Sequence, residues 1–234
     1  NTPDFDRVSV PVGRGERSIL VLRRFDRRQL NGEHERIGYV SAMTMLEARD
    51  GETRSYLDLV DVIETNGENV REQLHELWRR VAFTILINNT DDHLRNHGFL
   101  LTARHHWELS PVFDVNPTPD GTLLSTGIDL NDDPTADIKK HFETGLAFYR
   151  LTKDRASQTL AEILGAISRW RAVASRQRTT VSTARARLAP RFRCAVRTSD
   201  QCRKRCHRQF GDALGGAARR RRAAGGAAQS SWPA

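Results

Sequence analysis

Residues 69–88 carry the most regular pattern of apolar and polar positions in the chain. Apolar side chains recur there at steps of three and four residues, at Val70, Leu74, Leu77, Trp78, Val81, Ile85 and Leu86. This spacing predicts an amphipathic helix, and its last turns become apolar all round, as in a helix that enters a core. The helix is expected to end at residues 88–92, Asn-Asn-Thr-Asp-Asp, because these residue types favour loops.

Shorter patterns predict the remaining elements. Apolar runs predict strands over residues 18–22, 98–102 and 106–109. Helical spacing predicts further helices over residues 37–48, 55–65, 136–149 and 154–175. The order is strand, helices, loop, hairpin, loop, helices. It indicates an α+β fold that is mainly helical, with a small β-hairpin inserted between helical blocks.

The charge is divided unevenly along the 234 residues. Residues 176–234 hold 15 Lys and Arg against 2 Asp and Glu, a net charge of +13. The whole chain carries +8, so residues 1–175 carry the difference, −5. The high isoelectric point therefore belongs to this C-terminal tail, and an argument for nucleic-acid binding applies to the tail alone.

Several classes of protein are not indicated. The sequence has no apolar run of about 18 residues and no charged segment followed by an apolar core, so neither a membrane span nor a signal peptide is expected. All three cysteines, Cys194, Cys202 and Cys206, lie in the tail. A body without cysteine suits a reducing cytoplasm.

The tail itself, residues 176–234, is rich in Arg, Ala and Gly and shows no sustained period. It is expected to be disordered or to be an out-of-frame translation of a GC-rich gene. Two alternatives stay open. Cys194, Cys202, Cys206 and His207 form a zinc set of atypical spacing, and the run Arg219–Arg222 has the charge to contact nucleic-acid phosphates.

Three polar residues after the long helix form the most informative constellation. Asp91 and Asn96 are five residues apart, as in the catalytic loop of protein kinases, and Asp114 follows a Phe after the predicted hairpin. Phosphoryl transfer from ATP needs one carboxylate to accept the proton of the attacking hydroxyl, and amide and carboxylate oxygens to hold Mg²⁺. His93 lies between Asp91 and Asn96, where it braces the loop or approaches the nucleotide. Each residue alone is also consistent with an ordinary loop or turn position.

The flanking motifs make the pattern specific. Residues 90–96 read Thr-Asp-Asp-His-Leu-Arg-Asn, residues 107–114 read Trp-Glu-Leu-Ser-Pro-Val-Phe-Asp, and residues 24–27 read Arg-Phe-Asp-Arg. Together with Arg-Ile-Gly-Tyr-Val-Ser-Ala at residues 36–42, they resemble the HipA family of serine/threonine kinases over about residues 18–175. Lipid kinases of the phosphatidylinositol type share only a shorter resemblance, confined to the Asp-x-His-x-x-Asn loop.

This resemblance implies a protein-kinase-like C-lobe that uses ATP and Mg²⁺. It implies that Asp91 is the catalytic base, whose replacement by Ala would nearly abolish activity while leaving the fold intact, and that Asn96 and Asp114 bind the metal. The implied nucleotide-contacting residues are Arg23, Phe25, His93, Asn96, Phe113 and Asp114, and the backbone around Arg23–Phe25 is the implied hinge that meets adenine. HipA-like kinases act on a protein substrate and as toxins held by a DNA-binding antitoxin, so both partners are expected.

Two parts of a kinase are not evident. The glycine-rich phosphate loop and the strand lysine lie upstream of the hinge strand in this family, but the 17 residues before Ser18 contain no lysine, and Gly13-Arg14-Gly15 favours a hairpin turn. All four lysines of the chain lie at position 139 or later. The expected organisation is a remnant of the N-lobe at 1–17, the kinase domain at 18–175 and the tail at 176–234.

Three functions remain in competition. The first is a HipA-like serine/threonine kinase, inactive if the chain is only a fragment with the N-lobe largely missing. The second is a non-catalytic remnant that binds a partner. The third is nucleic-acid binding through the basic tail.

Overall fold

The computed structural model describes residues 5–12, 15–102, 105–118, 123–129, 135–170 and 172–173. All of them belong to one unit of the chain, Asn1–Ala189. The predictions made for the tail, including the zinc set and the arginine run, lie outside the described residues.

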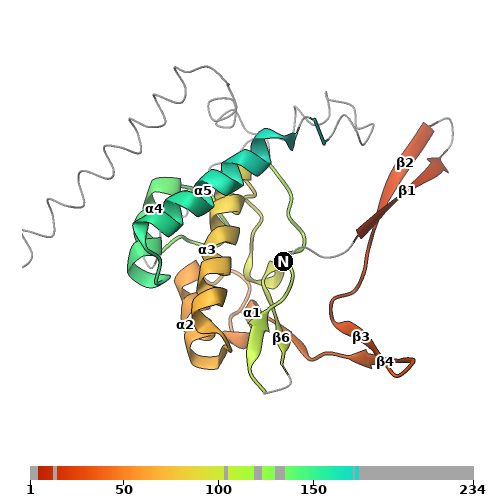
Figure 1. Ribbon diagram of the computed structural model, residues 1–234, viewed down its shortest axis with the longest axis horizontal. Helices are drawn as coiled ribbons and strands as arrows, with labels where there is room; N and C mark the ends of the chain where they lie inside the picture. Colours follow the sequence, from red (N-terminus) through yellow and green to blue (C-terminus); the bar gives the residue numbers. More distant parts are fainter. Residues whose placement is uncertain are drawn as a thin grey trace, which may run out of the picture. The chain divides into compact units, whose positions relative to one another are not determined.

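Four helices form the body of the structure around α3 (Val70–Ile87). Helices α2 (Tyr56–Asn66), α4 (Ile138–Phe148) and α5 (Lys153–Ser168) each contact α3, and Figure 1 shows α5 crossing over it. The side chains buried completely or almost completely on α2 and α3 are Tyr56, Leu59, Ile63, Leu74, Leu77, Trp78, Val81 and Ala82. The apolar period read from the sequence is therefore the face that packs inward, and α2 and α3 confirm the helices predicted over 55–65 and 69–88.

Local side chains set the ends of these helices. Helix α2 begins at Ser55, whose hydroxyl accepts from the Leu57 N–H at 3.2 Å while the Asp58 carboxylate accepts from the Ser55 N–H at 2.7 Å. This reciprocal pair satisfies backbone donors that an uncapped helix leaves open. Helix α3 is flanked by Asn69 and Asn88, both left-handed with φ of 54° and 59°. Asparagine tolerates this conformation better than most residues.

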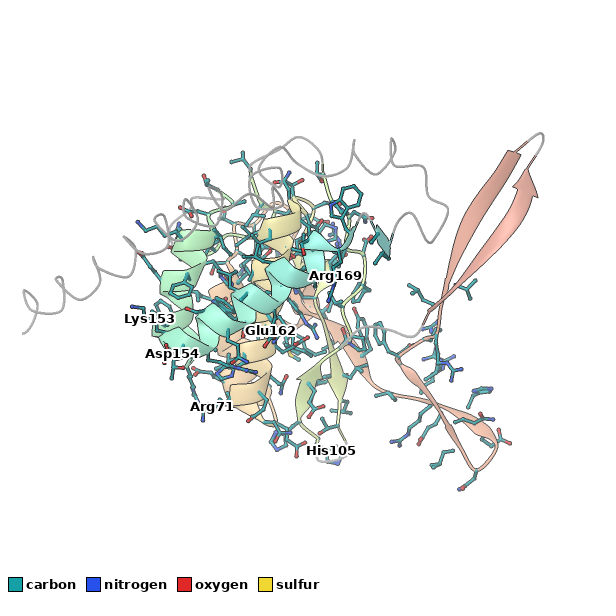
Figure 2. The ribbon with its side chains drawn as sticks, turned by 45° about the horizontal axis from the view of Figure 1, so that its top comes forward. Arg71, His105, Lys153, Asp154, Glu162 and Arg169 are labelled. Atoms are coloured by element: carbon teal, nitrogen blue, oxygen red, sulfur yellow. The ribbon has the colours of Figure 1, made fainter. Side chains whose placement is uncertain are left out.

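Helices α4 and α5 also form where they were predicted, although α5 is shorter. It ends at Ser168, while the pattern predicted a helix to residue 175. Figure 2 shows Lys153 and Asp154 at its start, Glu162 further along and Arg169 at its end. The Glu162 carboxylate accepts from the Arg79 guanidinium at 2.8 Å, which joins α5 to α3 at the surface.

A small antiparallel sheet stands beside the helices, in the order β5 (Tyr39–Ser41), β6 (Gly98–Leu101), β7 (Trp107–Leu109). The last two confirm the predicted hairpin. Tyr39 pairs with Leu100, and Leu100 pairs with Glu108. Gly98 has no side chain where the Tyr39 ring crosses, and a Cβ there would clash with that ring. This close approach explains glycine at the start of β6.

The helix predicted over 37–48 is largely wrong. Its first part is strand β5, and only α1 (Ala42–Met45) is helical. The mixed apolar spacing did not reveal that Val40 pairs with Phe99, about 60 residues away. The Ser41 hydroxyl then accepts from the Thr44 N–H at 3.2 Å and starts the single helical turn.

The N-terminal part forms two hairpins. Strand β1 (Phe5–Val12) pairs with β2 (Gly15–Leu22), which includes the predicted strand 18–22, and Val12 lies opposite Gly15, as the predicted hairpin turn requires. Strands β3 (Arg27–Leu30) and β4 (Glu33–Arg36) were not predicted, and they are joined by Asn31 and Gly32. These two residues have φ of 53° and 86°, the left-handed values that a tight hairpin turn needs.

The architecture confirms the predicted α+β class, with a mainly helical body and small antiparallel sheets. Within the described part of the chain, no helix combines the length and the apolar character needed to cross a membrane.

Candidate functional site

The loop that follows α3 brings Asp91 and Asn96 together. The Asn96 amide nitrogen donates to the backbone oxygen of Asp91 at 3.1 Å, across the five-residue step noted in the sequence. A short 3-10 turn, η1 (Leu94–Asn96), makes this possible, because the Asn96 N–H donates to the His93 carbonyl at 2.8 Å. Asp91 is exposed, whereas Asn96 is only 8% exposed. The loop thus presents one carboxylate to solvent and holds the amide beneath it.

Asp92, the next residue, points the other way and is only 6% exposed. Its Oδ2 accepts from the Tyr56 hydroxyl at 2.7 Å and from the Thr84 hydroxyl at 3.2 Å. The His97 Nε2 lies 3.2 Å from the same oxygen, within ion-pair distance but not aligned as a hydrogen bond. The sequence analysis gave Asp92 no role, and its partners come from separate elements.

These contacts decide the charge of the Asp92 carboxyl. Burial alone would raise its pKa, but the neighbouring His97 and the hydrogen bonds from Tyr56 and Thr84 together lower the pKa below its usual value. Burial and the nearby Asp92 charge raise the pKa of Tyr56 well above its usual value. At neutral pH the pair is therefore a buried carboxylate and a protonated phenol, which suits a hydrogen bond between them.

Asp114 lies in the middle of a segment that is fastened at both ends to this loop. The Ser110 N–H donates to the Gly98 carbonyl at 2.8 Å, just after the loop. At the other end, the Thr118 N–H donates to the Asn88 carbonyl at 2.9 Å, and the Asn88 amide donates back to the Thr118 carbonyl at 2.7 Å. Residues 110–118 therefore span the loop from its end to its beginning.

The Asp114 side chain is exposed and its backbone is left-handed, with φ of 51°. Its Oδ1 accepts from the Asn116 amide at 2.7 Å. A non-glycine residue with positive φ is uncommon, and such residues gather at functional sites. The carboxylate is thus held by a local turn on the segment that spans the loop.

Aromatic contacts bring the predicted hinge to this segment. The ring centroids of Phe25 and Phe113 are 5.8 Å apart, and those of Phe25 and Tyr39 are 6.0 Å apart. Asp26 accepts from the guanidinium groups of Arg24 and Arg27, each at 2.6 Å. The Arg24 hydrogen bond lowers the pKa of the Asp26 carboxyl despite a small opposing effect of burial. Phe25 and Phe113, about 90 residues apart in the chain, therefore lie in contact in the structure.

The other hinge residue, Arg23, is exposed next to this cluster in the chain. His93 is half-buried at the start of η1, and its Nδ1 is buried without a hydrogen-bond partner.

A pocket of about 620 Å³ lies alongside the loop. The loop contributes His93, Leu94 and Arg95 to its wall, and the opposite side comes from residues 49–55 and 124–129. Backbone bonds hold these two segments together, because the Tyr56 N–H donates to the Gly127 carbonyl at 2.8 Å and the Gly127 N–H donates to the Arg54 carbonyl at 2.9 Å. Arg95 forms an ion pair with Asp50 across the pocket rim.

The donor chemistry fits a magnesium ion better than a transition metal. No group of three or more His, Cys, Asp and Glu residues suited to a metal occurs among the described residues. The Asn96 amide nitrogen is engaged with Asp91, so its oxygen would be the ligand atom, and Asp114 would add an exposed carboxylate. Oxygen ligands in small number, completed by water and phosphate, are typical of Mg²⁺.

Comparison with known proteins defines the class. The family model described as HipA-like C-terminal domain matches residues 2–171, and this chain belongs to that family. The resemblance seen in the motifs is therefore confirmed.

Two relatives illustrate the family. A Haemophilus influenzae protein named "Putative kinase" is 32% identical over 101 residues, which cover 41% of this chain and 29% of that protein. A chain from the Shewanella oneidensis MR-1 toxin–antitoxin complex of HipA, HipB and operator DNA matches with a TM-score of 0.55 and 18% identity. This match covers 72% of this chain and 44% of the Shewanella chain. The chain spans less than half the length of either relative, and the structural likeness at this identity concerns the fold.

Proposed function

We propose that this chain carries the catalytic loop of a protein kinase that transfers a phosphoryl group from ATP to a Ser or Thr hydroxyl. The observation that carries the proposal is the arrangement of three residues. Asp91 faces solvent, Asn96 is bonded beneath it at 3.1 Å, and the segment that bears Asp114 is fastened to both ends of the loop. Family membership and the kinase name of the Haemophilus relative support the same activity.

Each residue has a role in this proposal. Asp91 orients the acceptor hydroxyl and takes its proton. The Asn96 oxygen and the Asp114 carboxylate hold Mg²⁺, which neutralises charge on the phosphates when it is bound. Arg23, Phe25, His93 and Phe113 contact the nucleotide, and the paired rings of Phe25 and Phe113 offer an apolar surface for adenine.

The acceptor is a segment of another protein, and the pocket beside His93 and Arg95 is the place for it. The pocket includes His93, two residues after Asp91, and is lined mainly by polar and charged side chains, which suits a polypeptide better than an apolar ligand. A DNA-binding antitoxin is the proposed regulatory partner, because the Shewanella relative is found with HipB and operator DNA.

Transfer of radiolabelled phosphate from ATP, with Mg²⁺, tests this function. The Asp91→Ala variant is expected to lower the rate by about 10² to 10⁴, the usual contribution of a general base. The matched control is Asp61→Ala, which removes an exposed carboxylate from α2, outside the site. Equal transfer by the Asp91→Ala variant and the unaltered protein would contradict the proposal. Absence of transfer by the unaltered protein would favour the alternative of a non-catalytic domain that binds a partner.

A further inference from the structure

We infer that Asp92 is a positioning residue, a buried carboxylate that fixes the backbone of the loop so that Asp91 faces the substrate. The inference about the loop itself rests on geometry alone. Only its consequence for catalysis rests on the proposed function.

The contacts of Asp92 join four separate parts of the structure. Its Oδ2 meets the Tyr56 hydroxyl from α2 and the Thr84 hydroxyl from α3, at 2.7 and 3.2 Å, and the His97 ring just before β6 at 3.2 Å. Its backbone carbonyl accepts from the Thr126 hydroxyl at 2.7 Å. The loop is therefore held at Asp92 by the helical body, by the small sheet and by the segment that lines the pocket.

The partners are themselves rigid. Tyr56 is fully buried and its ring meets the His97 ring edge to face, with centroids 5.7 Å apart. Thr84 and Thr126 are 4% and 1% exposed. Side chains that are locked by packing hold a neighbouring group more closely than exposed side chains do, which is what a site requires of its supporting residues.

The neighbouring carboxylates of Asp91 and Asp92 thus have different roles. Asp91 is exposed, and its side chain accepts no hydrogen bond from the described residues. Asp92 is 6% exposed and does not line the pocket. Because consecutive side chains on this loop face opposite sides, anchoring Asp92 inward directs Asp91 outward. Asp92 therefore acts through Asp91 and not on the substrate.

A neutral replacement separates the charge from the packing. In Asp92→Asn, one oxygen is exchanged for an NH₂ group that cannot accept from Tyr56, Thr84 or His97, and a buried donor left without an acceptor is costly. The loop is then expected to open more often, while the helices that do not depend on Asp92 stay closed.

Amide hydrogen exchange of the whole protein, read by mass spectrometry, tests this. In Asp92→Asn, amides of residues 89–98 are expected to exchange at least tenfold faster than in the unaltered protein, with α5 unchanged. Asp91→Asn, the matched variant one residue away, is expected to leave both regions unchanged. Tyr56→Phe keeps the packing and removes one hydrogen bond, so its effect is expected to be smaller. In the Asp92→Asn background, Tyr56→Phe is expected to cause no further acceleration of exchange.

Two outcomes would overturn the inference: exchange at residues 89–98 unaltered by Asp92→Asn, or equal acceleration in the loop and in α5, which would make Asp92 a general stability residue. The catalytic consequence is read separately, as a fall in kcat of at least tenfold with little change in the KM for ATP. If the unaltered protein transfers no phosphate, the proposed function fails while the exchange measurement still decides the role of Asp92.

Discussion

The helical body and the hairpin β3–β4 are stabilised by different interactions. In the body, α3 buries Leu74, Leu77 and Trp78 completely against neighbouring helices. In the hairpin, every residue from Arg28 to Arg36 is exposed, and the strands are joined by backbone pairing and a surface ion pair between Arg28 and Glu35. Burial of apolar area stabilises the first, whereas turn geometry and backbone hydrogen bonds form the second.

The candidate site takes residues from both kinds of structure. Its chemical groups, Asp91 and Asn96, stand on a loop that leaves α3, the most deeply packed helix. Its aromatic residue Phe25 comes from the exposed N-terminal part, immediately before β3. In the proposed kinase, the well-packed region would fix Asp91 and Asn96, and the exposed region would supply the aromatic contact of Phe25.

The largest expected difference between the two regions follows from Trp78→Ala. Trp78 is fully buried, its ring stacks on His141 at 5.1 Å, and its Nε1 donates to the His141 carbonyl at 3.1 Å. The variant is expected to lose about 3–5 kcal/mol of unfolding free energy, because it leaves a large cavity and removes a buried hydrogen bond. Urea denaturation followed by far-UV circular dichroism measures this. Leu30→Ala, on the half-exposed side chain of β3, is the control expected to show little change.

The next largest effect is a pH dependence confined to the helical body. His141 is fully buried, and burial lowers its pKa to about 4, against a smaller opposing effect of the hydrogen bond to the Trp78 carbonyl. Between pH 6.5 and 4 the unfolded chain binds a proton that the folded chain does not. This group is therefore expected to lower the unfolding free energy by up to about 3 kcal/mol as pH falls from 7 to 4.

Variants separate this titration from other groups. In His141→Phe the decline between pH 7 and 4 should be shallower, whereas His34→Gln, on the exposed strand β4, should decline as the unaltered protein does. Urea midpoints at several pH values provide the measurement. Parallel curves for the unaltered protein and His141→Phe would show that the buried imidazole is not the source.

The smallest effect is expected in the hairpin itself. Arg28 and Glu35 form an exposed ion pair, in which solvent screens the attraction. Arg28→Ala is expected to leave the thermal unfolding midpoint unchanged within experimental error. A fall comparable to that of Trp78→Ala would show that the hairpin is part of the cooperative unit and that the two regions are not as different as their burial implies.

The sequence predicted the body better than the rest for a physical reason. Helix α3 has a long, regular apolar period, and α2 has the Ser55–Asp58 pair at its start, so both are encoded locally. Strand β5 has only three residues, and its pairing with Phe99 and Leu100 is a distant contact that no local pattern contains. Strands β3 and β4 escaped detection because exposed, charged strands lack the alternation that marks a strand with one buried face.

The sequence predicted the motif residues of the candidate site but not the buried contacts that hold the loop in place. The spacing of Asp91 and Asn96 and the pair of Phe25 and Phe113 were visible as motifs, and the structure brings each pair together. Asp91 was singled out by its five-residue step to Asn96, but the anchoring contacts of Asp92 were not predicted, because a dipeptide of identical residues does not show which side chain faces inward. That depends on Tyr56 and Thr84, which reach the loop from other elements.

The doubly fastened segment 110–118 has a mechanical consequence. Because residues 110–118 are hydrogen-bonded to Gly98 at one end and to Asn88 at the other, the segment can shift in its middle but cannot move away as a whole. The displacement of Asp114 is therefore limited by the few residues on either side of it. The Asp114 carboxylate is therefore confined to a narrow range of positions relative to the loop that bears Asp91.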